Sequence, residues 1–140
     1  MSIYFLNCGS MRPYFPPVKN GVTCLLVETN HGPVLVDTGL GTQDYQNPGR
    51  RMNFFLKMMR SKRDINETAL YQLGRLGYKR EDVRHIIQTH LHLDHAGGLS
   101  DFPGAQVHVH NQNTITSCRI AVGNMSLIIG DTNRIGCCTS

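Results

Sequence analysis

The sequence has 140 residues, of which 40% are hydrophobic and 17% charged, and its net charge is +4. That length predicts one domain, and that composition excludes an intrinsically disordered chain. No apolar stretch approaches the roughly 18–20 residues of a membrane span, and the N-terminus lacks the basic start of a secretion signal. We therefore expect a cytoplasmic protein with no membrane span.

The first third of the chain predicts β-structure. A strand is expected over residues 3–7 (IYFLN), followed by a loop at 13–17 (PYFPP), because proline cannot donate a hydrogen bond to a sheet. Two apolar runs, 23–29 (TCLLVET) and 33–39 (PVLVDTG), flank the short joint NHG and predict a hairpin. Their continuous apolarity predicts strands that are buried on both faces.

The middle of the chain predicts helices. Residues 52–59 alternate basic and apolar groups in a pattern compatible with an amphipathic helix. A second helix is expected to begin at Asp64, which with Glu67 resembles a capping box, and to end at Gly77. The apolar face of this second helix is predicted to comprise Ile65, Leu70, Leu73 and Leu76.

Two further strands flank a histidine-rich bend. We expect strands over 84–89 (RHIIQT) and 106–110 (QVHVH), with a turn at 99–105 between them. The order of elements is therefore ββ(β)–α–β–loop–β, without an internal repeat. This order predicts the α/β class.

Residues 114–140 differ from the rest of the chain. All five tyrosines and all five phenylalanines lie at or before Phe102, whereas three of the five cysteines lie in this stretch. LIIGD (127–131) predicts a strand, but TNRIGCCTS (132–140) offers no pattern that would pack. We therefore expect a domain part over 1–113 and an atypical C-terminal tail over 114–140, the result of truncation or of a shifted reading frame.

The cysteines predict no chemistry. Their number is odd and no CxxC spacing occurs, which argues against a disulfide framework and against a zinc–thiolate site. We expect free, mostly buried thiols.

The stretch RRMNFFLKMMRSKR, residues 50–63, holds six basic residues and no acid. A nucleic-acid binder would spread such charge over a larger face with base-reading groups nearby, so no nucleic-acid partner is expected. Three interpretations remain: a helix with a solvated basic face, a flap whose Phe and Met side chains receive an acyl tail, and a membrane-surface contact.

The stretch THLHLDHAGG, residues 89–98, predicts a metal site. His90 and His92 point to the same side of an extended segment and can bind one ion, because imidazole nitrogens suit zinc, iron, nickel or copper. Asp94 and His95 follow on the bend, where they can reach a second ion. Two glycines, Gly97 and Gly98, then permit a tight backbone. The end of a strand is where α/β proteins usually hold ligands.

This stretch resembles the HxHxDH signature of the metallo-β-lactamase superfamily. VLVDTG, with Asp37 and Gly39, resembles the strand and turn that precede the signature in that family. Residues 77–105 are most similar to the N-acyl-homoserine lactonase branch, and the resemblance covers about residues 3 to 113. It implies the N-terminal half of an αβ/βα sandwich, with a mixed sheet and flanking helices.

The resemblance also implies a function. His90 and His92 would bind the first of two Zn²⁺ ions, with Fe, Mn, Ni or Co as substitutes, and Asp94 and His95 the second. Asp94 would also act as the catalytic proton-transfer group, and Asp37 would orient ligands by hydrogen bonds. The implied reaction is hydrolysis of a small-molecule lactone or ester by a metal-activated hydroxide.

The chain departs from the family in its later ligands. The family uses two further histidines and a bridging aspartate, but the seventh and last histidine here is His110. Asp131 is a candidate for the bridging aspartate, and His108 or His110 for a histidine; His31 and His85 are expected to be exposed. The alternative function is a truncated, catalytically impaired half-domain that binds metal weakly or acts only by association. Its uncovered sheet face predicts self-association as a homo-oligomer.

Overall fold

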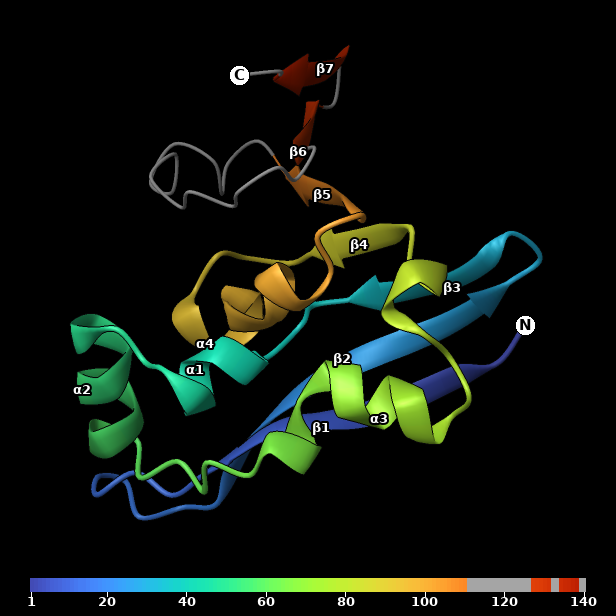
Figure 1. Ribbon diagram of the computed structural model, residues 1–140. Helices are drawn as coiled ribbons and strands as arrows, with labels where there is room; N and C mark the ends of the chain where they lie inside the picture. The colour runs from blue at the N-terminus through green and yellow to red at the C-terminus, as the bar shows by residue number, and fades with distance from the viewer. Residues whose placement is uncertain (111–126, 132–133, 139–140) are drawn as a thin grey trace.

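The computed structural model describes residues 1–110, 127–131 and 134–138, which form a mixed sheet of seven strands with helices (Figure 1). The strands are β1 (Ile3–Met11), β2 (Asn20–Thr29), β3 (Gly32–Val36), β4 (His85–Gln88), β5 (Gln106–His110), β6 (Leu127–Asp131) and β7 (Arg134–Cys138). The helices are α1 (Thr42–Gln46), α2 (Arg50–Met58), α3 (Ala69–Arg75) and α4 (Leu93–Ala96), with 3₁₀ turns η1 (Ile65–Glu67), η2 (Arg80–Asp82) and η3 (Gly97–Asp101).

The strands lie side by side in the order of the sequence. Strands β1, β2 and β3 are antiparallel, and the predicted hairpin is confirmed, because Thr29 pairs with Gly32 across a two-residue turn. Strands β3, β4, β5 and β6 are parallel, so their carboxyl ends meet at one edge of the sheet. The predicted α/β order is therefore confirmed, and this edge is the one that follows Val36 and Gln88.

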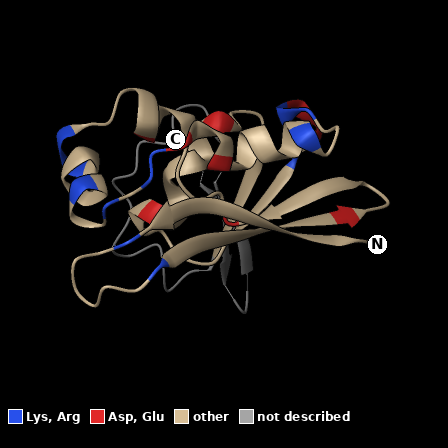
Figure 2. Cartoon of the chain, turned by 90° about the horizontal axis from the view of Figure 1, so that it is seen from below, with Lys and Arg blue, Asp and Glu red and all other residues tan. Residues whose placement is uncertain are grey.

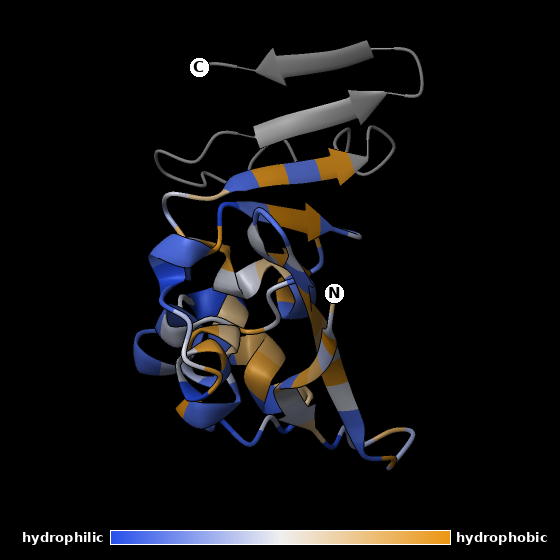
Figure 3. Cartoon of the chain, turned by 90° about the vertical axis from the view of Figure 1, so that its right-hand side faces the viewer, coloured by the Kyte–Doolittle hydropathy of each residue, from blue (hydrophilic) through white to orange (hydrophobic). Residues whose placement is uncertain are grey.

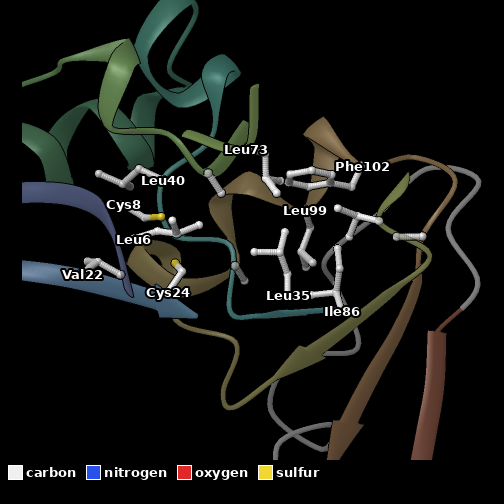
Figure 4. Close-up of a cluster of buried hydrophobic side chains, with 14 of the residues drawn as sticks. Leu6, Cys8, Val22, Cys24, Leu35, Leu40, Leu73, Ile86, Leu99 and Phe102 are labelled. Carbon is white, nitrogen blue, oxygen red and sulfur yellow. The ribbon is translucent and has the colours of Figure 1, made fainter. Parts of the chain in front are cut away.

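The helices that pack on the sheet cover one of its faces, as Figure 2 shows from below. The face beneath them carries the hydrophobic core, part of which is drawn in Figure 4. The core side chains with at most 2% of their surface exposed include Cys8, Cys24, Leu26, Leu35, Leu40, Leu56, Leu73, Ile86, Leu99, Phe102 and Val107. Figure 3 shows the alternation that produces this face, with hydrophobic and hydrophilic residues taking turns along β5.

The opposite face of β1–β4 is apolar and open, so the prediction of strands buried on both faces is wrong. Leu25 and Val27 of β2 are only half-buried. Neighbouring strands expose more, since Phe5 is 77% exposed and Ile87 46% exposed. These side chains lie on the face without a covering helix among the described residues, which is what a single layer of helices leaves behind.

The helix predicted from Asp64 to Gly77 is two elements. Asp64 accepts a hydrogen bond from the backbone N–H of Asn66 and therefore caps only the short turn η1. Thr68 caps α3, because its side chain accepts from the backbone N–H of Tyr71. Gly77 ends the helix as expected and has a positive φ of 87°.

The predicted apolar face of this helix is correct only in part. Leu73 is fully buried, whereas Leu76, which caps the end of α3, is 40% exposed. Leu76 lies beyond the last residue of α3, at the surface end of the helix, whereas Leu73 lies within it.

The basic segment forms α2, an amphipathic helix. Met52 and Leu56 are buried, while the basic side chains of the helix are exposed, and Figure 2 shows their positions in blue. A helix with a solvated basic face is therefore the arrangement observed. Within the described ranges, none of the helices is long and apolar enough to cross a membrane.

The tail contains more order than the sequence predicted. Strand β6 matches the strand predicted at LIIGD, but β7 was not predicted and pairs with β6 in an antiparallel ladder. Backbone pairing of this kind needs no apolar pattern, so β7 could not be predicted from the pattern of residues 132–140. The proposed boundary after Asn113 lies outside the described residues.

Two cysteines agree with the predicted free thiols. Cys8 and Cys24 are buried and unbridged. The prediction for Cys118, Cys137 and Cys138 falls outside the residues whose side chains are described.

Candidate metal centre

The candidate site lies at the carboxyl ends of two neighbouring parallel strands. Asp37 follows β3 and the stretch 89–98 follows β4, and these strands pair in register with Val36 beside Ile87. The backbone N–H of Asp37 donates to the carbonyl of Ile87 at 2.9 Å, which extends this ladder to the site itself.

Asp37 is the centre of a hydrogen-bond network. Its Oδ1 accepts from the backbone N–H of Thr89 at 2.8 Å and from Nε2 of Gln88 at 2.9 Å. Its Oδ2 accepts from the hydroxyl of Thr89 at 2.7 Å and lies 3.1 Å from Nδ1 of His95. Asp37 is 5% exposed, so these four partners replace water around the carboxylate.

The contact with Asp37 orients His95. A carboxylate only accepts hydrogen bonds, so this contact places a proton on Nδ1 of His95 and leaves Nε2 as the nitrogen that can face a cation. This Nε2 lies 3.9 Å from Oδ2 of Asp94, the other polar side chain of α4. The arrangement presents a metal-binding nitrogen and a carboxylate side by side.

The imidazole ring of His90 lies close to the rings of both His92 and His95. The rings of His90 and His95 are 4.0 Å apart between centroids, and those of His90 and His92 are 4.7 Å apart and perpendicular. His92 has the extended conformation expected for it and is exposed. Asp94 and His95 lie in the short helix α4 rather than on an irregular bend, so this detail of the prediction is corrected.

The donor atoms present fit a divalent cation. One ligand atom from each of Asp37, His90 and His95 lies within 4.8 Å of the other two. Imidazole nitrogen and carboxylate oxygen are the donors that zinc and similar ions accept. The four hydrogen bonds that Asp37 accepts agree with the orienting role expected from the sequence, and they leave His90 and His95 as the candidate ligands of this group. His92 and Asp94 are not part of the group.

Comparison with known proteins agrees with this geometry. The sequence profile of the metallo-β-lactamase superfamily matches residues 18–110. The chain belongs to the metallo-β-lactamase superfamily.

Two curated relatives are similar over most of the chain. A Mycobacterium tuberculosis protein named as a probable metallo-hydrolase is 46% identical over 109 residues, which are 78% of this chain and 34% of the relative. An N-acyl homoserine lactonase of Bacillus thuringiensis is 34% identical over 149 aligned positions, covering 92% of this chain and 60% of the lactonase. The chain thus spans between about a third and three fifths of these relatives.

The fold matches solved lactonases in the same way. The structure of an N-acyl homoserine lactone hydrolase, described with the product N-hexanoyl-L-homoserine at its catalytic metal centre, superposes with a TM-score of 0.72 at 28% identity. The match covers 94% of this chain and 60% of that structure. The described sheet and helices are therefore the N-terminal portion of the superfamily fold.

The two glycines of the superfamily signature are needed for close packing. Neither has a positive φ, so the expected reason, unusual backbone freedom, is wrong. A Cβ on Gly98 would lie 2.7 Å from the backbone oxygen of Thr38, and one on Gly97 would lie 2.1 Å from Oδ2 of Asp44. Because neither glycine has a side chain, η3 can pack closely against the loop that follows β3.

Gln88 is a site residue that the sequence analysis missed. It is 2% exposed, and its Nε2 lies 2.9 Å from Asp37 Oδ1 and from the carbonyls of His90 and His95. One side chain therefore links the carboxylate to both ends of the histidine stretch. The available signal was its place on β4, two residues after the inward-facing Ile86, where an apolar residue would be expected.

The other candidate ligands lie apart or are not described. The backbone of Asp131 ends β6 at the same edge of the sheet as Asp37, but its side chain, like that of His110, is outside the described residues. His108 is not in this cluster and contacts His85 on β4. His31 is exposed in the β2–β3 turn, as predicted.

Proposed function

We propose that this site belongs to a metal-dependent hydrolase that opens a lactone or cleaves an ester. Lactone hydrolysis is the activity for which the similar N-acyl homoserine lactonases described above are named. The observation that supports it is the convergence of Asp37, His90 and His95 at the carboxyl edge of β3 and β4. His90 and His92 would hold one Zn²⁺, and Asp94 and His95 a second. Bound ions of this kind supply a hydroxide nucleophile at neutral pH and polarise a carbonyl group.

The polar side chains around the histidines have distinct roles in this proposal. Asp37 keeps the proton of His95 on Nδ1, so that Nε2 faces the cation site. Gln88 and Thr89 hold Asp37 in place, which preserves this tautomer when a substrate enters. Asp94 is half-buried and close to Nε2 of His95, where its carboxylate would take a proton from the attacking water and then give it to the leaving alkoxide.

The decisive experiment measures metal content and turnover together. Purified chain is loaded with Zn²⁺, and the bound ions are counted by mass spectrometry while an N-acyl homoserine lactone and a simple ester are offered as substrates. His92→Ala is expected to lower both the ion count and turnover, because it removes one ligand of the first ion. His31→Ala is the matched control, since His31 is exposed in a distant turn.

A second candidate function is a metal-binding half-domain that acts only through association. The open apolar face of β1–β4, with Phe5 77% exposed, favours it. Fewer than one ion per chain, no turnover and a homo-oligomer that Phe5→Lys dissociates would support this function over the hydrolase. About two ions per chain with lactone turnover would support the hydrolase.

A further inference from the structure

A second pair of histidines lies on the open face of the sheet. His85 begins β4 and His108 lies in the middle of β5, and the parallel register places His108 beside Ile87. The side chains meet diagonally across the two strands, with Nδ1 of His85 3.1 Å from Nε2 of His108 and ring centroids 5.3 Å apart. The two residues are 23 positions apart in the sequence, and only the pairing of β4 with β5 brings them together.

This pair is separate from the candidate metal centre. Side chains alternate along β4, so His85 and Ile87 point to the open face whereas Ile86 and Gln88 point to the helix-covered face. His85 also stands five positions before His90, about 16 Å along an extended chain. An ion bound to one cluster would not share ligands with the other.

The separation of the two nitrogens matches the bite of one cation. Two nitrogens that each lie about 2.0–2.1 Å from one Zn²⁺, at an angle of about 90–110°, are about 2.9–3.4 Å apart. The observed 3.1 Å falls within this range. Because the strands that carry the two residues pair at four successive positions, the backbone holds the two residues side by side before any ion arrives.

The protonation state favours binding as well. Without an ion, one nitrogen of the close pair donates its proton to the other. An ion needs both lone pairs, so that proton moves to the outer nitrogen of the same ring and no net proton is released. Burial, with the nearby charge of His85 as a smaller cause, lowers the pKa of His108, and this shift favours the neutral form of the ring that can bind a metal.

We propose that His85 and His108 form a second metal site, which binds a single Zn²⁺, Ni²⁺ or Cu²⁺ ion on the open face of the sheet, with water completing the coordination. His85 is exposed and His108 half-buried, so the ion enters directly from solvent. This site should fill after the centre at the strand ends, because that centre has a histidine oriented by Asp37 and a carboxylate beside it, whereas this pair consists of imidazoles alone.

Zn²⁺ titration of the intact chain at neutral pH tests the site, with calorimetry and metal counting as readouts. Wild type is expected to bind one ion more, in a later and weaker phase, than either His85→Gln or His108→Gln. Each substitution removes one of two ligands and should weaken that phase at least about tenfold. His31→Gln is the control and should keep the phase, because it removes an exposed histidine that has no part in the pair.

Ring-nitrogen NMR of the wild-type chain provides a test that does not depend on any variant folding. Zn²⁺ in excess of the stronger centre should shift the signals of Nδ1 of His85 and Nε2 of His108 together, and acidification below the histidine pKa range should reverse the shift. The proposal is overturned if those two signals stay unchanged, or if both glutamine variants bind as many ions as wild type. Either outcome leaves the proposed hydrolase unaffected, because its ligands are different residues.

Discussion

The two faces of the sheet differ although the same strands build both. On the helix-covered face, Leu35 and Ile86 have no exposed surface, whereas on the open face Phe5 and Ile87 expose 77% and 46% of theirs. Ile86 and Ile87 are adjacent residues of one strand, so neither composition nor strand propensity explains the difference. Position relative to the single helix layer decides which apolar side chains stabilise the fold.

Truncating each isoleucine in turn gives the largest expected effect. Ile86→Ala should lower the free energy of unfolding by about 2–5 kcal/mol, because it leaves a cavity in the core. Ile87→Ala should lower it by roughly 1 kcal/mol or less, since water already contacts that side chain. Urea unfolding of both variants measures the difference, and equal losses would show that the open face is covered in solution.

A smaller effect is expected where the covered face meets the site. Gly98→Ala should lower the free energy of unfolding by about 1–3 kcal/mol, because the new Cβ would meet the backbone oxygen of Thr38 at 2.7 Å and force the two loops apart. Gly104→Ala, which meets nothing within 4 Å, should change it by no more than about 0.5 kcal/mol. Thermal unfolding of the pair gives the comparison, and metal affinity should fall with Gly98→Ala alone.

The smallest effect concerns a carboxylate between α1 and η3. Burial, more than the nearby charge of Asp101, raises the pKa of Asp44 above its ordinary 3.8, although a hydrogen bond from Gly41 opposes the shift. The folded chain therefore holds this proton more tightly than the unfolded chain, so the contribution of Asp44 to stability should fall as pH rises from 3.8 through the folded pKa.

Asp44→Asn should remove this dependence, because an amide does not titrate. The free energies of unfolding of wild type and variant should therefore diverge over that interval and then stay parallel toward neutral pH. Curves that run parallel from pH 3.8 upward would contradict the raised pKa.

Local pattern was sufficient to predict much of the fold. The hairpin before Asp37, β4, β5 and the stop at Gly77 each depend on a few adjacent residues whose apolar period or turn chemistry is visible in the sequence. The break before α3 was missed because Asp64 and Thr68 are both good caps, and only packing decides which one begins the longer helix.

Candidate site residues could be predicted where they are close in sequence. The motif singled out His90, His92, Asp94 and His95, and the structure groups the ligand atoms of His90 and His95 with Asp37, which was reached through the family resemblance. Gln88 and the pairing of His85 with His108 depend on strand register, which a single sequence does not specify.

Asp37 adopts a φ of 60°, a left-handed backbone that few residues other than glycine tolerate. Glycine at this position would relax the turn and abolish the carboxylate at once. The backbone conformation at this position favours glycine, whereas the site needs a carboxylate there. Asp37 therefore keeps a strained conformation that holds its carboxylate against His95.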